Sequence, residues 1–281
     1  MQVKNNRQAT KRSDFLPVNK ADMEERGWDE LDFLLVTGDA YVDHPSFGHA
    51  IIARCLEARG YRVGISAQPD WRSTDDFAKM GKPRLAVMVS AGNLDSMLNH
   101  YTASGKKRHK DNYTPGGSAG KRPDRATMVY CNRIRELWKD VPLIIGGIEA
   151  SLRRMAHYDF WSDSVRRSLL VDCRADLLVF GMGELASAQI AKSLAEGVPV
   201  SALRDIPGTC WKTHNPECAN DAVVLPSFEE VKSDKKLFAA AFKRFYLEQD
   251  SFRGCRLIQD QGAWHVVQNR PARPLTEGEM D

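Results

Sequence analysis

Short apolar runs that stop abruptly at glycine or polar residues recur along the first two thirds of the chain. A run of this kind is typical of a buried parallel strand whose carboxyl end turns sharply into a loop or helix. Between the first two runs, apolar residues recur at helical spacing and Gly60 provides a helix stop. Strand, helix and strand in this order predict a βαβ unit with a right-handed crossover. The predicted strands cover residues 32–37, 61–67, 85–89, 143–145 and 177–180.

The pattern as a whole predicts an α/β fold, with a doubly wound parallel sheet over residues 31–197. Residues 1–30 are predicted to form an N-terminal arm, flexible up to Asn19. Residues 198–281 are predicted to form a smaller mixed α/β segment that ends in a proline-rich linker. In that segment the pattern predicts β-like pieces at 200–204 and 222–225, a helix over 235–248 and a strand over 263–268.

Composition and charge exclude several classes of protein. The chain has 281 residues, of which 42% are hydrophobic and 27% charged, as in an ordinary globular protein. A formal net charge of +3 gives no electrostatic case for nucleic acid or an anionic membrane. No apolar run approaches the roughly 18 residues of a membrane span, and the polar N-terminus is no secretory signal. Six scattered cysteines without a C-x-x-C pair favour free thiols in a reducing cytoplasm.

The best site candidates lie where the apolar runs end, because ligands of doubly wound folds sit at the carboxyl ends of the strands. The loop after the first strand offers a hydroxyl, an acid and an imidazole, although turn chemistry explains Asp39 and His44 equally well. Paired glycines after the fourth strand allow a close backbone approach. Arg153 and Arg154 suit a phosphate or carboxylate, but arginines in such a position are more often paired locally. The candidate residues are Thr37, Gly38, Asp39, His44, Gly146, Gly147, Glu149, Arg153, Gly181, Gly183 and Glu184.

Other motifs carry less information. The chain has no Walker A loop, no G-x-G-x-x-G, no G-x-S-x-G, no H-E-x-x-H and no three-cysteine cluster loop. Cys210, His214 and Cys218 do not have a recognised zinc spacing, and buried free thiols are the commoner explanation. The aromatic and charged stretch 157–168 is either a polar network that locks a loop to the sheet or a surface for a ligand or partner. Residues 104–125 are basic, rich in glycine and proline, and lack apolar periodicity, which predicts a functional or mobile insertion.

Several strings together resemble YgiQ-type radical SAM proteins over residues 22–281. They include Val36–Gly48, Gly92–Met97, Gly120–Thr127 and Gly146–Arg154. The resemblance implies an N-terminal cobalamin-binding-like, flavodoxin-like domain that positions a substrate or cofactor. It also implies a following radical SAM barrel as the partner, where C-x3-C-x2-C holds a [4Fe–4S] cluster that cleaves S-adenosylmethionine. This chain contains no such motif, so it is expected neither to ligate the cluster nor to be active alone.

The cobalamin fingerprint D-x-H-x-x-G is not matched, since Asp43 and His44 are adjacent in Asp43–Gly48. Three alternatives therefore stay open: cobalamin with His44 as the lower ligand, cobalamin without a histidine ligand, or no cobalamin. A competing hypothesis is a non-catalytic module that binds an anionic ligand or a protein through residues 104–125 and Arg153–Arg154.

Overall fold

The computed structural model of the chain describes residues 14–280 and contains a nine-stranded sheet in the order β2-β1-β3-β4-β7-β8-β11-β10-β9. The first five strands in this order are parallel to one another. Numbered along the chain they follow the order 2-1-3-4-5, which is the flavodoxin-like doubly wound order. The predicted fold class is confirmed. These strands are β1 (Phe33–Thr37), β2 (Val63–Ala67), β3 (Ala86–Ser90), β4 (Leu143–Gly146) and β7 (Leu177–Val179).

Helices cover both faces of this parallel part. Side chains that alternate along β1 divide between two cores: Leu34 and Val36 face one, Phe33 and Leu35 the other. Helices α2 (Gly48–Glu57) and α8 (Glu184–Ala195) cover the second face. The remaining helices of this region are α1 (Lys20–Glu25), α3 (Asp75–Ala78), α4 (Ser96–His100), α5 (Ala126–Leu137), α6 (Gly147–Leu152) and α7 (Leu169–Asp172).

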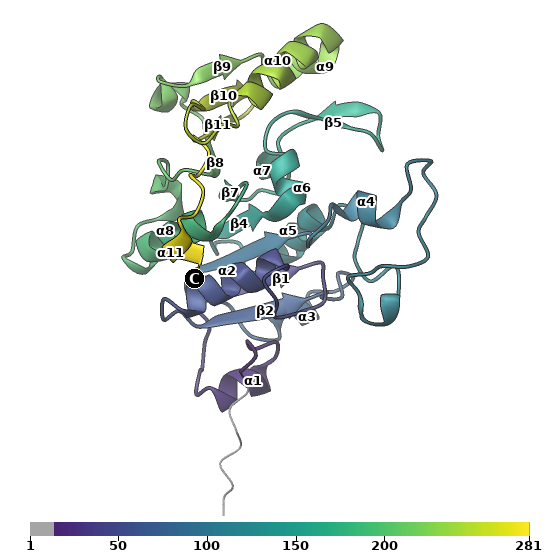
Figure 1. Cartoon of the computed structure of the whole chain (residues 1–281), viewed down its shortest axis with the longest axis vertical. Helices are drawn as coiled ribbons and strands as arrows, with labels where there is room; N and C mark the ends of the chain where they lie inside the picture. Colours follow the sequence, from purple (N-terminus) through teal and green to yellow (C-terminus); the bar gives the residue numbers. More distant parts are fainter. Residues whose placement is uncertain (1–13, 281) are drawn as a thin grey trace, which may run out of the picture.

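The C-terminal residues extend the same sheet. Strand β8 pairs antiparallel with β7, β11 with β8 and β10 with β11, whereas β9 pairs parallel with β10. Figure 1 shows β9, α9 and α10 at one end of the molecule and β2 and α1 at the other. The elements are β8 (Thr209–Thr213), β9 (Val223–Leu225), α9 (Phe228–Ser233), α10 (Lys235–Leu247), β10 (Leu257–Asp260), β11 (His265–Gln268) and α11 (Glu277–Met280).

One local prediction was wrong in this region, and one strand was missed. The β-like piece expected at 200–204 is a 3-10 turn (Val200–Ala202), because Pro199 fixes the entry and its carbonyl accepts a hydrogen bond from the Ala202 N–H. Strand β8 was not predicted, since Lys212 interrupts its apolar pattern. The Lys212 ammonium reaches the carbonyl oxygen of Ala175 at 2.5 Å while its stem stays largely buried.

The predicted flexible arm lies partly outside the described residues, which begin at Asp14. Its described part packs against the sheet: Leu16 is 1% exposed, and the Pro17 carbonyl accepts a hydrogen bond from the Ile65 N–H at 2.8 Å. The expectation of flexibility up to Asn19 is therefore wrong for the described residues, because Leu16 joins the apolar core.

Two segments stand outside the sheet. A hairpin of β5 (His157–Asp159) and β6 (Ser164–Arg166) follows α6. Between α4 and α5 lies the predicted insertion, with a 3-10 turn (Pro115–Gly117) and two isolated β-bridges. Its Tyr113 carbonyl accepts a hydrogen bond from the Ala40 N–H at 2.9 Å, which joins the insertion to the loop after β1.

Candidate functional site

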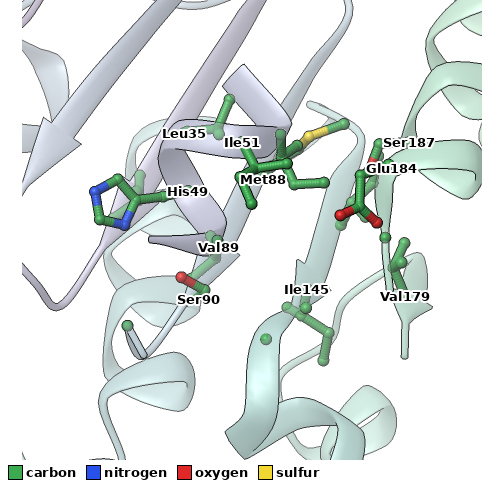
Figure 2. Close-up of a pocket in the computed structure, with 18 of the residues that line it drawn as sticks. Leu35, His49, Ile51, Met88, Val89, Ser90, Ile145, Val179, Glu184 and Ser187 are labelled. Carbon is green, nitrogen blue, oxygen red and sulfur yellow. The ribbon is translucent and has the colours of Figure 1, made fainter. Parts of the chain in front are cut away.

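A groove of about 210 Å³ lies at the carboxyl ends of β1, β3, β4 and β7, between the first turns of α2 and α8. This is the point at which the strand order reverses, where ligands of this fold class sit. Figure 2 shows Ile51, Met88 and Leu35 on one side of the groove, with Val179 and Ile145 near the strand ends. Most of the wall is apolar, so the groove suits an apolar part of a ligand.

Four of the predicted glycines line this groove: Gly146, Gly147, Gly181 and Gly183. Gly147 has a φ of +78°, and a Cβ there would lie 3.2 Å from the Ser90 Cβ, so the tight turn from β4 into α6 requires glycine. The glycines leave backbone rather than side chains at the mouth of the groove. The expectation that ligands sit at the carboxyl ends of the strands thus selected four glycines that line this groove.

Glu184 supplies the charged group of the groove. It is the first residue of α8, where a carboxylate is favoured by the helix dipole. In Figure 2 its carboxylate lies near Ser187, over the space between Met88 and Val179. Its Oε2 is buried and has no hydrogen-bond partner within residues 14–280. A buried acceptor of this kind is costly unless a ligand or water donates to it.

The two histidines between β1 and β2, His44 in the loop and His49 in the first turn of α2, have different surroundings. His44 is exposed, is absent from the groove lining, and accepts a hydrogen bond from the Ser46 N–H through Nδ1. His49, which was not among the predicted residues, does line the groove. Its ring nevertheless points away from Met88 and Glu184 (Figure 2) and lies between Tyr41 and Phe47. Burial lowers the pKa of His49 to about 4, so the ring is neutral at physiological pH.

Asp39 belongs to a buried ion network beside the groove. Arg122, from the insertion, approaches Asp39 Oδ1 at 2.8 Å and Asp111 Oδ2 at 3.4 Å, and both members of the Asp39–Arg122 pair are 0% exposed. The contact with Asp39 is an ion pair whose angle departs from that of a hydrogen bond. Burial raises the pKa of Asp39 even though the guanidinium opposes the shift.

The network also explains the glycine that follows Thr37. A Cβ on Gly38 would lie 2.2 Å from the Ala91 carbonyl oxygen and 3.2 Å from the Arg122 side chain. The Thr37 hydroxyl accepts a hydrogen bond from the Asp39 N–H at 3.2 Å. Asp39 and Gly38 therefore lie against Arg122 of the insertion, Thr37 supports Asp39, and none of the three lines the groove.

Glu149 and Arg153 also make internal contacts. The Glu149 carboxylate is 2% exposed and accepts hydrogen bonds from the N–H and hydroxyl of Ser96 and from the Thr127 N–H. It thereby joins α6 to the first turns of α4 and α5. Arg153 forms an ion pair with Asp95. Neither residue lines the groove, which matches the local pairing that the sequence left open for the arginines.

Arg154 and the hairpin hold the loop after α6 in place. The Arg154 guanidinium lies over the rings of Phe180 and Phe245, at 4.5 and 4.2 Å from their centroids, and its Nε donates to Gln268. In the hairpin, Asp159 pairs with Arg125 at 2.6 Å. The Asp159–Arg125 pair is a polar contact of stretch 157–168, whereas the contacts of Arg154 lie outside that stretch, so both of its alternatives stay predictions.

Within residues 14–280, no group of three or more His, Cys, Asp or Glu side chains is arranged to hold a metal ion. Cys210 is buried in β8, Cys218 is exposed, and His214 stacks on Trp264 with centroids 3.6 Å apart. An iron–sulfur cluster needs cysteine thiolates, and the described residues offer no such set.

Besides His49, sequence reasoning missed Ser90, Asn93 and Ser187 as polar residues that line the groove. Ser90 ends β3, so the strand-end rule applied to it as well. Ser187 lies one helical turn after Glu184, a spacing that places both on one face of α8. Among residues 14–280, none of the helices combines the length and apolar character that a bilayer crossing requires.

A family model described as radical SAM N-terminal matches residues 15–281. The chain belongs to the radical SAM N-terminal family. The resemblance expected from the sequence is confirmed. This radical SAM N-terminal chain is 55% identical to a UPF0313 protein of Clostridium botulinum (strain ATCC 19397 / Type A) over 268 residues, covering 95% of the chain and 42% of that protein. A UPF0313 protein of Clostridium perfringens (strain ATCC 13124) is 57% identical over 268 residues, covering 95% and 40%. The chain thus spans about two fifths of the length of these relatives.

Among solved structures, the radical SAM N-terminal chain is similar to TsrM of Kitasatospora setae, a radical S-adenosylmethionine methyltransferase. The TsrM structure with tryptophan and a SAM analogue gives 21% identity and a TM-score of 0.43, covering 64% of the chain and 28% of TsrM. A TsrM structure with cobalamin and a [4Fe–4S] cluster gives the same identity and TM-score, covering 64% and 29%.

Proposed function

We propose that this domain holds a substrate or cofactor by its apolar part in the groove, for radical chemistry that depends on S-adenosylmethionine. In a protein of the relatives' length, that chemistry would be carried out by a following radical SAM barrel. The observation that carries the proposal is the groove itself: an apolar cavity of about 210 Å³ with the unpartnered Glu184 carboxylate oxygen within it. A ligand with an apolar face and an N–H or O–H donor satisfies both features.

The course of the chain supports the proposal. Strands β8 and β11 run antiparallel, so β11 returns to the edge at which β7 ends. There the Gly208 N–H donates to the Arg270 carbonyl at 2.8 Å, and the Phe180 N–H donates to the Gly208 carbonyl at 2.8 Å. Residues that follow β11 therefore leave the sheet at the same edge as the groove.

Cobalamin is the cofactor that we propose as a ligand of the groove. It would supply cobalt-based radical or group-transfer chemistry. The apolar wall and the Glu184 acceptor suit a large amide-bearing ring, whereas the turned-away ring of His49 and the exposed His44 do not aim an imidazole into the groove. Of the three alternatives left open by the sequence, the geometry therefore favours cobalamin bound without a histidine ligand to the cobalt.

The experiment is a titration of the 281-residue chain with hydroxocobalamin, followed by absorbance. We expect saturable binding with a shifted spectrum, weakened at least about tenfold by Gly146→Val. Gly146 lines the groove in an extended conformation, and a Cβ there would make only ordinary van der Waals contact, 3.5 Å from the nearest atom, so valine adds apolar bulk at the groove wall. Gly278→Val is the matched control, since Gly278 lies in the exposed helix α11.

A second measurement tests whether the groove binds a small molecule other than cobalamin. The full-length protein and its Gly146→Val variant are purified in parallel and the small molecules that they carry are compared by native mass spectrometry. A ligand retained by the parent protein and lost from the variant supports the proposal. If the chain takes up no cobalamin and both full-length proteins carry the same small molecules, the groove is not the binding site.

A further inference from the structure

The insertion between α4 and α5 encloses a second cavity, of about 320 Å³, that shares no lining residue with the groove. Its wall comes from α4 and from residues 101–124. The Arg108 N–H donates to the His100 carbonyl at 2.7 Å, and the bridges Tyr101–Lys107 and Lys110–Ser118 close the sides. Backbone hydrogen bonds thus fix the wall although the segment lacks regular secondary structure.

Positive charge predominates around this cavity. Lys107, Arg108 and Lys110 line it, and none of them forms an ion pair within residues 14–280. The two carboxylates of the wall already have partners. Asp124 accepts from His100 Nδ1 at 2.6 Å and from the Tyr101 hydroxyl at 2.7 Å. Asp111 accepts from the Tyr113 N–H and pairs with Arg122.

One buried donor of the wall also lacks an acceptor. Asn99 is 7% exposed, and its Nδ2 has no hydrogen-bond partner among the described residues. His100 Nε2 is likewise buried without a hydrogen-bond partner among those residues. Arg108 uses Nε to donate to the carbonyls of Leu98 and Tyr101, which holds its guanidinium in one orientation. A buried amide donor without an acceptor destabilises a protein unless something accepts from it.

We propose that this cavity binds an anionic group, a phosphate or a carboxylate, of a small-molecule ligand. Three unpaired cations and the buried Asn99 amide are the donor set that such a group requires, and charge-assisted hydrogen bonds are the strongest that it can form. The site is separate from the groove and does not depend on the groove being occupied. The two cavities adjoin through the Asp39–Arg122 pair, because Arg122 lines this cavity and Asn93, whose N–H donates to Asp39, lines the groove.

The test measures binding of two probes, pyrophosphate and citrate, to the 281-residue chain by isothermal titration calorimetry. The double variant Lys107→Gln/Lys110→Gln removes two exposed cations of the cavity and leaves its backbone intact. The matched control, Lys235→Gln/Lys236→Gln, removes the same charge from the exposed start of α10. Equal thermal midpoints for the three proteins establish that all are folded.

We expect the parent chain and the control to bind one of the probes saturably, and the cavity variant to bind it at least about tenfold more weakly. Preference for pyrophosphate assigns the site to phosphate, and preference for citrate assigns it to carboxylate. His100 provides a local readout, since its ring signals in an NMR titration should shift with the same saturation curve.

Two results overturn the proposal. One is the absence of saturable binding of either probe to the parent chain. The other is equal weakening in the cavity variant and in the control, which would mean that only overall charge matters. If single-stranded RNA binds in a salt-sensitive manner while neither probe saturates, the surface is a polyanion contact and the small-molecule site is refuted.

Discussion

Replacing Arg122 should lower the free energy of unfolding through one defined interaction, its buried ion pair with Asp39. It is the largest fully buried side chain among residues 14–280, and it neutralises Asp39 at the end of β1. The substitution Arg122→Met keeps much of the apolar volume but leaves the Asp39 carboxylate buried without its cation. Removing one partner of a buried ion pair destabilises a protein by about 3–5 kcal/mol.

The loss of unfolding free energy in Arg122→Met should be smaller at low pH than at neutral pH. Burial already raises the pKa of Asp39 with Arg122 present, and the loss of the guanidinium should raise it further. A carboxyl group with a raised folded-state pKa destabilises the protein as pH rises from its unfolded value, about 3.9, through the folded value. The difference between variant and parent should therefore shrink as the pH falls toward the unfolded value.

Urea denaturation followed by circular dichroism measures the free energy of unfolding directly. The double variant Asp39→Asn/Arg122→Met should recover at least half of the loss, because no buried charge of Asp39 remains. Lys192→Met is the control, since its pair with Glu196 is exposed and should contribute less than about 1 kcal/mol. A loss below about 1 kcal/mol for Arg122→Met, or no recovery in the double variant, would refute the role given to the pair.

Other predictions concern the backbone, pH and thiols. Gly92→Ala should destabilise the chain by more than about 1 kcal/mol in the same urea assay, because Gly92 has a φ of +107° and a Cβ would lie 2.1 Å from Asp39 Oδ1. Burial lowers the pKa of His49 to about 4, so the free energy of unfolding should fall as pH drops from about 6.5 toward 4, and His49→Gln should flatten that slope. With a thiol reagent, Cys218 should react at once, whereas the buried Cys131, Cys173 and Cys210 should react only on unfolding. Fast labelling of a buried thiol in the native chain would contradict the packing of the core.

The parallel half of the sheet was predictable because β1, β3, β4 and β7 are local apolar runs, and β2 follows a helical pattern that stops at a glycine, which completes a βαβ unit. Strand β8 escaped prediction, since Lys212 is accommodated by the carbonyl of Ala175 and the ring of Trp264, and the folded chain makes those contacts. The local pattern at 209–213 contains no sign of them.

The candidate site was predictable to a similar degree. The strand-end rule found Glu184 and the glycines, because it depends on topology alone. It also selected Asp39, whose side chain is occupied by Arg122 from a distant insertion without apolar periodicity. Ion pairs between segments so far apart in sequence depend on the tertiary fold. The residue type at a strand end therefore could not distinguish a residue that lines the groove from one that contacts the insertion.

Strand β11 ends at the edge of the sheet that carries the groove, which determines where a segment joined after β11 would contact the domain. A Cβ added to Gly208, beside the end of β7, would lie 3.1 Å from the Ala272 Cβ, so the chain after β11 passes close to this point. A segment joined there by a short linker would remain tethered near the mouth of the groove, at an effective concentration on the order of millimolar. Even an intrinsically weak contact between the two parts would then be populated most of the time, so ligand transfer between them would not require a tight interface.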